Sequence, residues 1–145
     1  MMDEEHVTEA IEAYLRSSGW SIFAVDYPTS GSGLRIHPND RLEGTKHAGS
    51  VVPDVVAYRK NRLLIVENKP YFDTNDAEKL ARISAGTYDR SLEARVYATE
   101  FDEIVTALGF PAAYESEIQY DSVDTLDRLY LVSSDGSVER RAIDL

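Results

Sequence analysis

The sequence predicts an α/β domain in which helices flank a mixed β-sheet. Three observations lead to this prediction: an amphipathic N-terminal helix, two adjacent strand-like runs at residues 51–58 and 62–69, and a second helix directly after them. A C-terminal hairpin adds two further strands. Helices and strands in this order are typical of a mixed sheet that is covered by helices. The 145 residues are expected to form one domain, residues 1–145.

The first two elements are a helix and a short strand. Val7 and Ile11 begin a stripe of apolar residues with a 3.6-residue period, which predicts an amphipathic helix over residues 4–18. Gly19 supplies its stop. Residues 21–26 are then typical of a short strand.

A long loop is expected over residues 28–50, which are rich in glycine, serine and proline and lack periodicity. The loop is basic on an otherwise acidic chain, and it carries Arg35, Arg41 and Lys46. These three cations are candidate contacts to DNA phosphates. A solvated loop without any ligand explains them equally well.

The most informative feature is a predicted hairpin formed by residues 51–58 and 62–69. A turn centred between the two strands pairs positions whose numbers sum to a constant, and it sets Asp54 opposite Glu67 on one face of the sheet. Lys69 shares that face because side chains on a strand repeat with a period of two. Two carboxylates and one ammonium group are therefore expected at one end of this hairpin.

This pairing of acids is costly unless it has a partner. Residues 63–66 are all apolar, so the strand that carries Glu67 is expected to be buried on both faces. Two carboxylates that face each other near its end repel unless a cation or a proton lies between them. Hard divalent ions prefer carboxylate and carbonyl oxygens. Asp54 and Glu67 are therefore candidate metal ligands, with Lys69 suited to stabilising an attacking hydroxide or the developing charge.

A second helix is expected after the hairpin. Asn75 with Glu78 resembles a capping box, which predicts that the helix begins there. The residues expected to form its packing face are Ala77, Leu80, Ala81, Ser84 and Tyr88.

The remaining elements complete the order α-β-β-β-α-β-α-β-β. Residues 94–99 predict a strand, and residues 101–108 predict a short helix that ends at Gly109. Residues 129–134 and 137–143 predict a hairpin around an Asp-Gly turn.

Pro-Asp at residues 53–54 and Glu-Asn-Lys at residues 67–69 resemble the motif of the PD-(D/E)xK nuclease superfamily. That superfamily includes restriction endonucleases and archaeal Holliday junction resolvases, and residues 4–90 follow its α-β-β-β-α core order. The resemblance implies a restriction-endonuclease-like fold with an α-β-β-β-α-β core. It also implies a Mg²⁺- or Mn²⁺-dependent endonuclease that cuts DNA and leaves 5′-phosphate and 3′-hydroxyl ends.

The resemblance implies a role for each motif residue. Asp54 and Glu67 would bind the metal, and the backbone carbonyl of Asn68 would be a further ligand. Lys69 would polarise the attacking water. Many members of the superfamily add a glutamate from the first helix, and the rise per residue of helix and strand selects Glu4 for that position.

The charge of the chain is unusual for a DNA-binding protein. The formal net charge is -11, from 26 acidic and 15 basic residues, of which only four are lysine. Such a field repels nucleic acid at ordinary salt. One explanation is a halophilic host, because molar salt screens charges beyond about 3 Å. The other is an acidic surface that faces a partner or imitates nucleic acid. We favour the halophilic explanation.

Several classes of protein are excluded or disfavoured. The chain has no cysteine, so disulfides and thiolate metal sites are excluded. It lacks an apolar run long enough for a transmembrane helix, and its acidic N-terminus does not resemble a signal peptide. A cytoplasmic protein without membrane contact is the simplest interpretation. DNA is the expected partner, and a homodimer or a partner subunit of a restriction or repair complex is a further expectation.

Three alternatives to an active nuclease stay open. In the first, Glu67 and Lys69 form a structural ion pair and Asp54 merely begins a strand. In the second, the chain is a catalytically inactive binding subunit with a nuclease fold. In the third, it is an acidic interaction protein that imitates DNA.

Overall fold

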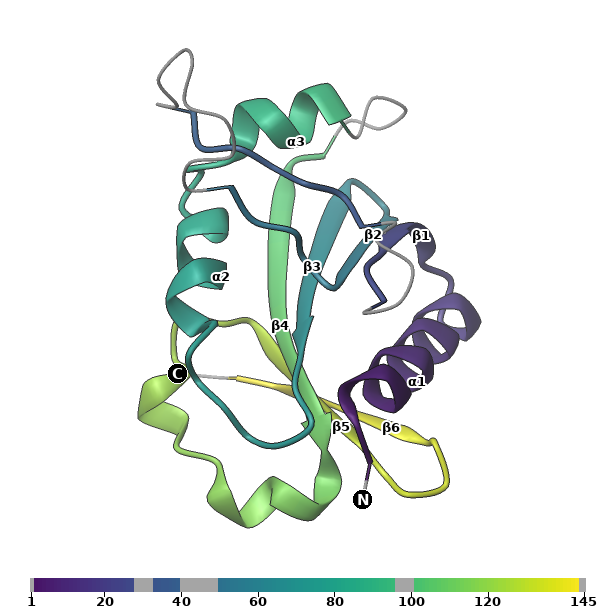
Figure 1. The fold of residues 1–145 in the computed structure, drawn as a ribbon. Coiled ribbons are helices and arrows are strands. Elements are labelled where there is room, and N and C mark those ends of the chain that lie inside the picture. The colour runs from purple at the N-terminus through teal and green to yellow at the C-terminus, as the bar shows by residue number, and fades with distance from the viewer. Residues whose placement is uncertain (1, 28–32, 40–49, 96–100, 144–145) are drawn as a thin grey trace.

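Six strands form one twisted sheet with helices on both faces (Figure 1). The structure, a computed structural model, describes residues 2–27, 33–39, 50–95 and 101–143. Its elements are α1 (Glu4–Ser17), β1 (Ser21–Val25), β2 (Val55–Arg59), β3 (Arg62–Asn68), α2 (Ala77–Ser84), α3 (Asp89–Arg95), β4 (Glu103–Pro111), the 3₁₀ helices η1 (Ala112–Glu117) and η2 (Tyr120–Ser122), β5 (Arg128–Val132) and β6 (Val138–Ala142).

The sheet is mixed, as the sequence predicts. The strands lie in the order β1-β2-β3-β4-β5-β6, with parallel pairing of β4 to both β3 and β5 and antiparallel pairing elsewhere. The two parallel pairs need crossover connections. The segment with α2 and α3 makes the first crossover, and the segment with η1 and η2 makes the second. The predicted fold class, an α/β mixed sheet flanked by helices, is confirmed.

Strand β3 is the buried centre of the molecule. Its residues Leu64 and Val66 point into the core beneath α1, whereas Leu63 and Ile65 point into the core beneath α2 and α3. All four side chains have no exposed surface. Each stabilises the fold by about 1.5–3 kcal/mol through its removal from water. The end of β3 is therefore a rigid position for functional groups.

Helix α1 agrees with its prediction. Asp3 is the N-cap and its side chain accepts a hydrogen bond of 2.9 Å from the backbone N–H of His6. Val7, Ile11 and Leu15 form the buried stripe. Gly19, with a φ of 91°, then reverses the chain into β1.

Two details of the predicted second helix are wrong. Helix α2 has Asp76 at its N-cap, without a side-chain capping bond, so Asn75 and Glu78 do not form a capping box. On its packing face Ile83 is buried, whereas Ser84 is exposed. The packing face is set by contact with the sheet, which favours the larger apolar side chain.

The region after α2 differs most from the prediction. Residues 101–108 do not form a helix. Strand β4 includes residues 103–108 and pairs with β3 and β5, and this pairing overrides their local helical pattern. Gly109 is inside β4 rather than at a helix end. Residues 94–95 end α3 instead of beginning a strand, and residues 96–99 lie outside the described part.

The two hairpins agree with the predictions. Strands β5 and β6 pair antiparallel, and Gly136, with a φ of 87°, is in their turn. The first hairpin has the expected register, although β2 is shorter than predicted because Val51 makes only an isolated bridge to Ile36. Within the described ranges, no helix is both long and apolar enough to cross a membrane.

Candidate active site

Asp54 and Glu67 meet at the end of the first hairpin, as the register predicts. Val55 pairs with Val66, so the next pair outward is Asp54 with Glu67. The Asp54 carboxylate accepts a hydrogen bond of 2.7 Å from the backbone N–H of Asn68. The two carboxyl groups lie close enough for each to affect the protonation of the other. The structure thus places both acids on one face of the sheet, the face covered by α2.

Burial controls the protonation of this carboxyl pair. It raises the pKa of Glu67 well above the ordinary value, and the neighbouring charge of Asp54 raises it further. Burial also raises the pKa of Asp54, although the N–H of Asn68 and the carboxyl group of Glu67 oppose that rise. Glu67 is only 3% exposed, so water cannot compensate its charge. The folded pair therefore binds protons more tightly than two solvated carboxyl groups would.

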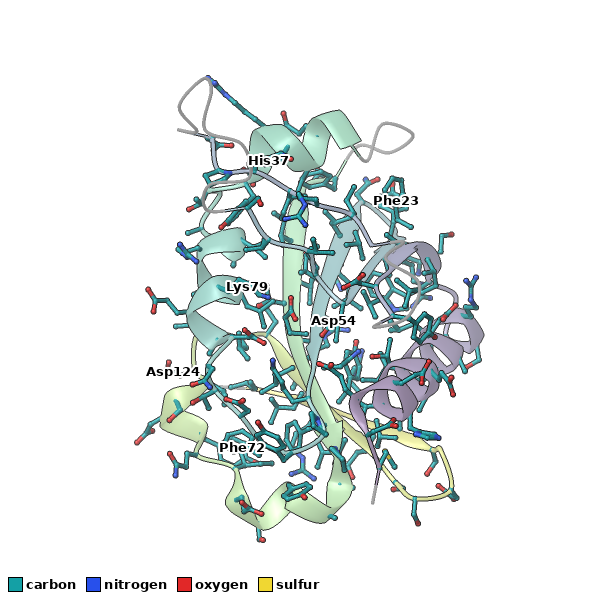
Figure 2. All side chains as sticks on the ribbon, viewed as in Figure 1. Phe23, His37, Asp54, Phe72, Lys79 and Asp124 are labelled. Atoms are coloured by element: carbon teal, nitrogen blue, oxygen red, sulfur yellow. The ribbon has the colours of Figure 1, made fainter. Side chains whose placement is uncertain are left out.

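The ion pair of Lys69 lies outside the carboxyl pair. Nζ of Lys69 lies 2.7 Å from Asp76, not beside Glu67. The ammonium group of Lys79, on α2, instead lies 2.8 Å from Glu67 and 3.8 Å from Asp76 (Figure 2). The alternative of a structural ion pair between Glu67 and Lys69 is therefore wrong for this conformation. The hairpin motif contributes one cation to this end of the sheet, and α2 contributes another.

Sequence reasoning missed Asp76 and Lys79. They lie three residues apart at the start of α2, so their side chains share one face of the helix. The chain enters α2 shortly after leaving the end of β3, which brings that first turn back over the carboxyl pair. The signal that could have identified them is an acid and a lysine three residues apart at the start of the helix that follows the strand with Glu67.

Glu4 lies near the pair but does not join it. Burial raises its pKa, and the charge of Asp54 raises it further while Lys69 opposes. The first turn of α1 is tied to β3, because Asn68 donates a hydrogen bond of 3.1 Å to Thr8. Among the residues that the structure describes, no three acidic or histidine side chains are grouped as metal ligands. Glu4 is therefore within electrostatic reach of Asp54 without sharing a ligand set with it.

The donor set at this end of β3 fits a divalent cation. Asp54 and Glu67 supply carboxylate oxygens that face each other. A cation between them would offset the burial that raises both pKa values and the charge of Asp54 that raises the pKa of Glu67 further. Lys79 already neutralises part of this charge. The site would hold the ion through two side chains and complete its shell with carbonyl or water oxygens.

The predicted DNA contacts are only partly described. Arg35 is exposed and donates a hydrogen bond of 3.0 Å to the side chain of Ser50. Arg41 and Lys46 lie outside the described residues. The structure brings none of the described part of this loop into a hydrogen bond or ion pair with the carboxyl pair.

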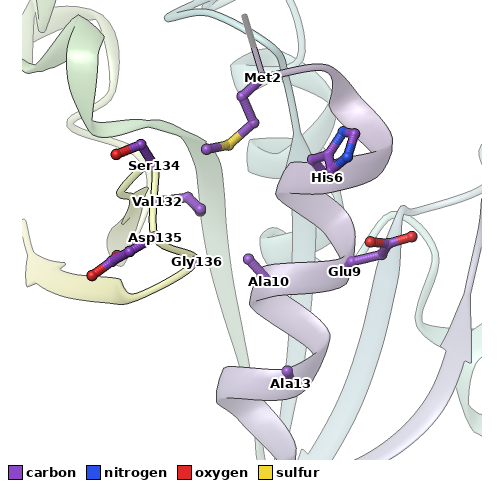
Figure 3. Close-up of a pocket in the computed structure, with 9 residues that line it drawn as sticks. All are labelled: Met2, His6, Glu9, Ala10, Ala13, Val132, Ser134, Asp135 and Gly136. Atoms are coloured by element: carbon purple, nitrogen blue, oxygen red, sulfur yellow. The ribbon is translucent and has the colours of Figure 1, made fainter.

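A pocket lies away from the carboxyl pair. It has a volume of about 650 Å³, lies between α1 and the turn from β5 to β6, and is open to solvent (Figure 3). Glu9 of the helix and Asp135 of the turn contribute its acidic groups, and most of the lining is apolar. Neither Asp54 nor Glu67 lines this pocket. The carboxyl pair is therefore a separate site.

Fold and site together define an α/β domain with a buried carboxyl pair at the end of its central hairpin. No family model and no curated protein matches the chain. Among solved structures it is similar to an XisH family protein from Nostoc punctiforme, with 16% identity, a TM-score of 0.50, and coverage of 94% of this chain and 98% of that one. An fdxN element excision controlling factor protein from Anabaena variabilis matches with 18% identity, a TM-score of 0.49, and coverage of 96% and 98%. At such identity the first similarity shows a common fold alone.

Proposed function

We propose that this protein is a Mg²⁺- or Mn²⁺-dependent nuclease of the PD-(D/E)xK type that hydrolyses phosphodiester bonds in DNA. The observation that supports it is the buried, facing pair Asp54 and Glu67, whose repulsion calls for a cation. Lys69 lies two residues after Glu67, directly beyond the end of β3, as the resemblance requires. The proposal includes DNA as partner, a homodimer or partner subunit, and a cytoplasmic location.

Each residue has a distinct proposed role. Asp54 and Glu67 hold the metal, with the backbone carbonyl of Asn68 as a third oxygen. Lys69 supplies positive charge to the attacking water or to the phosphate, and Asp76 orients it through their contact of 2.7 Å. When bound, the metal supplies a Lewis acid that lowers the pKa of water and stabilises negative charge.

A second candidate function has its own support. Lys79 lies 2.8 Å from Glu67, and Lys69 lies 2.7 Å from Asp76, so cations of the chain itself already offset these acids. A nuclease fold stabilised in this way needs no metal. It would act as an inactive binding subunit, in agreement with the fold and without cleavage.

A cleavage assay decides between the two functions. Branched, single-stranded and duplex DNA are incubated with the protein and Mn²⁺ across a wide range of salt. We expect cutting by the wild type, and loss of at least a hundredfold in Lys69→Ala, because that variant lacks the charge that stabilises the transition state. Arg82→Ala is the matched control, since Arg82 is an exposed cation in the last turn of α2.

Two results would contradict the nuclease proposal. Equal cutting by the wild type and by Lys69→Ala would show that Lys69 has no part in the cleavage reaction. No cutting by the wild type at any salt, together with DNA or protein binding that survives Glu67→Ala, would favour a binding subunit or an acidic DNA mimic.

A further inference from the structure

A pocket with a basic lining lies at the other end of β3 from the carboxyl pair. It has a volume of about 330 Å³, and we call it the basic pocket. Its lining consists of Trp20, Arg59, Lys60, Arg62, Arg128 and Arg140. Strand β3 runs from Arg62 to Asn68, so about 20 Å separates the two sites at the usual rise per residue. The basic pocket is therefore distinct from the candidate active site.

Tertiary structure gathers these cations from three parts of the chain. Arg59 and Arg62 are paired at the tip of the first hairpin, and Lys60 is in its turn with a φ of 49°. Arg128 begins β5, and Arg140 lies on β6. Arg128 and Arg140 are far in sequence from the hairpin tip, so no local motif predicts the whole pocket.

The pocket concentrates positive charge that is mostly unbalanced. It holds five of the chain's 15 lysines and arginines, on a chain with a net charge of -11. Arg62 has a carboxylate partner, Glu103 at 3.2 Å, and both side chains are about half exposed. Arg128 donates a hydrogen bond of 3.3 Å to the hydroxyl of Tyr130. In the described part of the chain, Arg59, Lys60 and Arg140 form no ion pair with an acid.

Like charges in one concave site repel, and an anion relieves the repulsion. The concave shape also focuses the positive potential and attracts anions from solution. Arginine offers a planar fork of N–H donors that matches a phosphate group. The chemistry of the lining therefore favours phosphate over a carboxylate of single charge.

We propose that the basic pocket binds a compact polyphosphate anion, such as a nucleoside triphosphate or inorganic tripolyphosphate. Its volume is in the range of pockets that hold small molecules. Duplex DNA spreads its charge evenly along a rod and is matched by a stripe of cations. The cations here converge on one pocket instead, which suits several phosphates on a small ligand. This assignment does not depend on the proposed nuclease activity.

The chain carries its own reporter for this site. Trp20 is the one tryptophan in the sequence, it lines the basic pocket, and it is 9% exposed. Titration with tripolyphosphate, or with a nucleoside triphosphate, is expected to change its fluorescence in a saturable manner. Isothermal titration calorimetry at low salt measures the same affinities independently. Equal affinity for the two ligands means that phosphate alone is recognised, and tighter binding of the nucleotide adds a contact with the base.

Two neighbouring arginines provide the variant and its control. Arg140 pairs with Tyr130 on the α1 face of the sheet, whereas Arg141 pairs with Leu129 on the other face and contacts Glu115 and Glu139. We expect Arg140→Gln to weaken tripolyphosphate binding by about tenfold or more, since it removes a charge-assisted hydrogen bond. Arg141→Gln is expected to bind like the wild type.

Arg59→Gln gives a second test if Arg140→Gln fails to fold, which thermal melting would reveal. The proposal is wrong if neither ligand binds the wild type, or if Arg140→Gln and Arg141→Gln lose the same affinity. It is also wrong if a short DNA duplex binds through Arg140 while tripolyphosphate does not, because the pocket would then be a contact for the DNA backbone.

Discussion

The ammonium group of Lys79 lies 2.8 Å from the buried carboxyl group of Glu67. This relationship links the first turn of α2 to the end of β3, and it gives the carboxyl pair a counter-charge from outside the hairpin. The motif lysine, Lys69, is left to pair with Asp76 at 2.7 Å. Four charged groups therefore lie around Glu67: Asp54, Lys69, Asp76 and Lys79. Substitution of each group should separate its structural role from its functional role.

Lys79→Met is expected to bind Mn²⁺ more tightly than the wild type. The ammonium group and the metal both neutralise Glu67, so removal of the ammonium removes a competitor. The same change should destabilise the metal-free protein by about 1–3 kcal/mol, because it leaves the buried carboxyl group of Glu67 without its partner. Calorimetric titration with Mn²⁺ and urea denaturation measure the two effects. Arg82→Met is the control, and weaker Mn²⁺ binding by Lys79→Met than by this control would argue against competition.

Glu67→Gln is expected to change the pH dependence of stability. Burial raises the folded-state pKa of Glu67 above its ordinary value of 4.5, so the folded protein holds the proton more tightly than the unfolded chain. The contribution of Glu67 to the free energy of unfolding should therefore be highest below pH 4.5 and fall as the pH rises through the folded-state pKa. The variant should lose this fall and be more stable than the wild type at neutral pH without metal.

Urea denaturation at a series of pH values, in the presence of a chelator, tests this expectation. Glu78→Gln is the matched control because Glu78 is exposed on α2. If both variants retained the wild-type pH dependence, Glu67 would not be the group responsible.

Divalent metal is expected to stabilise the wild type against heat and denaturant. A ligand at about 100 times its Kd that binds only the folded state adds about 2.7 kcal/mol to the free energy of unfolding. Asp54→Asn should abolish most of this gain, since it removes one of the two facing carboxylates. Thermal melts with Mg²⁺, Mn²⁺ and chelator provide the measurement. A gain of the same size in Asp54→Asn would place the stabilising metal elsewhere.

Gly109→Ala is expected to destabilise the protein by about 1–3 kcal/mol through overpacking. A Cβ at Gly109 would collide with Cδ1 of Ile11 on α1 and with the side-chain oxygen of Asn68 on β3. Ile11→Val removes that Cδ1 atom, so the double variant should recover part of the loss relative to the sum of the two single changes. Denaturation of the four proteins measures the coupling, and strict additivity would show that the collision with Ile11 is not the cause.

The parts of the fold that local patterns specify were predicted correctly. The stripe from Val7 to Leu15 defines α1, and the alternation of residues around a short turn defines the register that sets Asp54 opposite Glu67. Prediction from local pattern failed where pairing with neighbouring strands determines the secondary structure. Residues 101–108 carry a weak helical pattern. Residues 103–108 nevertheless form part of β4 between β3 and β5, and most of them are buried, because burial of both faces outweighs propensity.

Strand periodicity alone established which side chains lie on the face of Glu67, since a pleated chain alternates its faces whatever surrounds it. It could not establish the partners of those side chains. Lys79 reaches Glu67, and Arg62, Arg128 and Arg140 line one pocket, only because crossovers and a hairpin bring distant segments to the same end of the sheet. Charges act through space, so their balance at either end of β3 depends on the packed chain and not on the order of its residues.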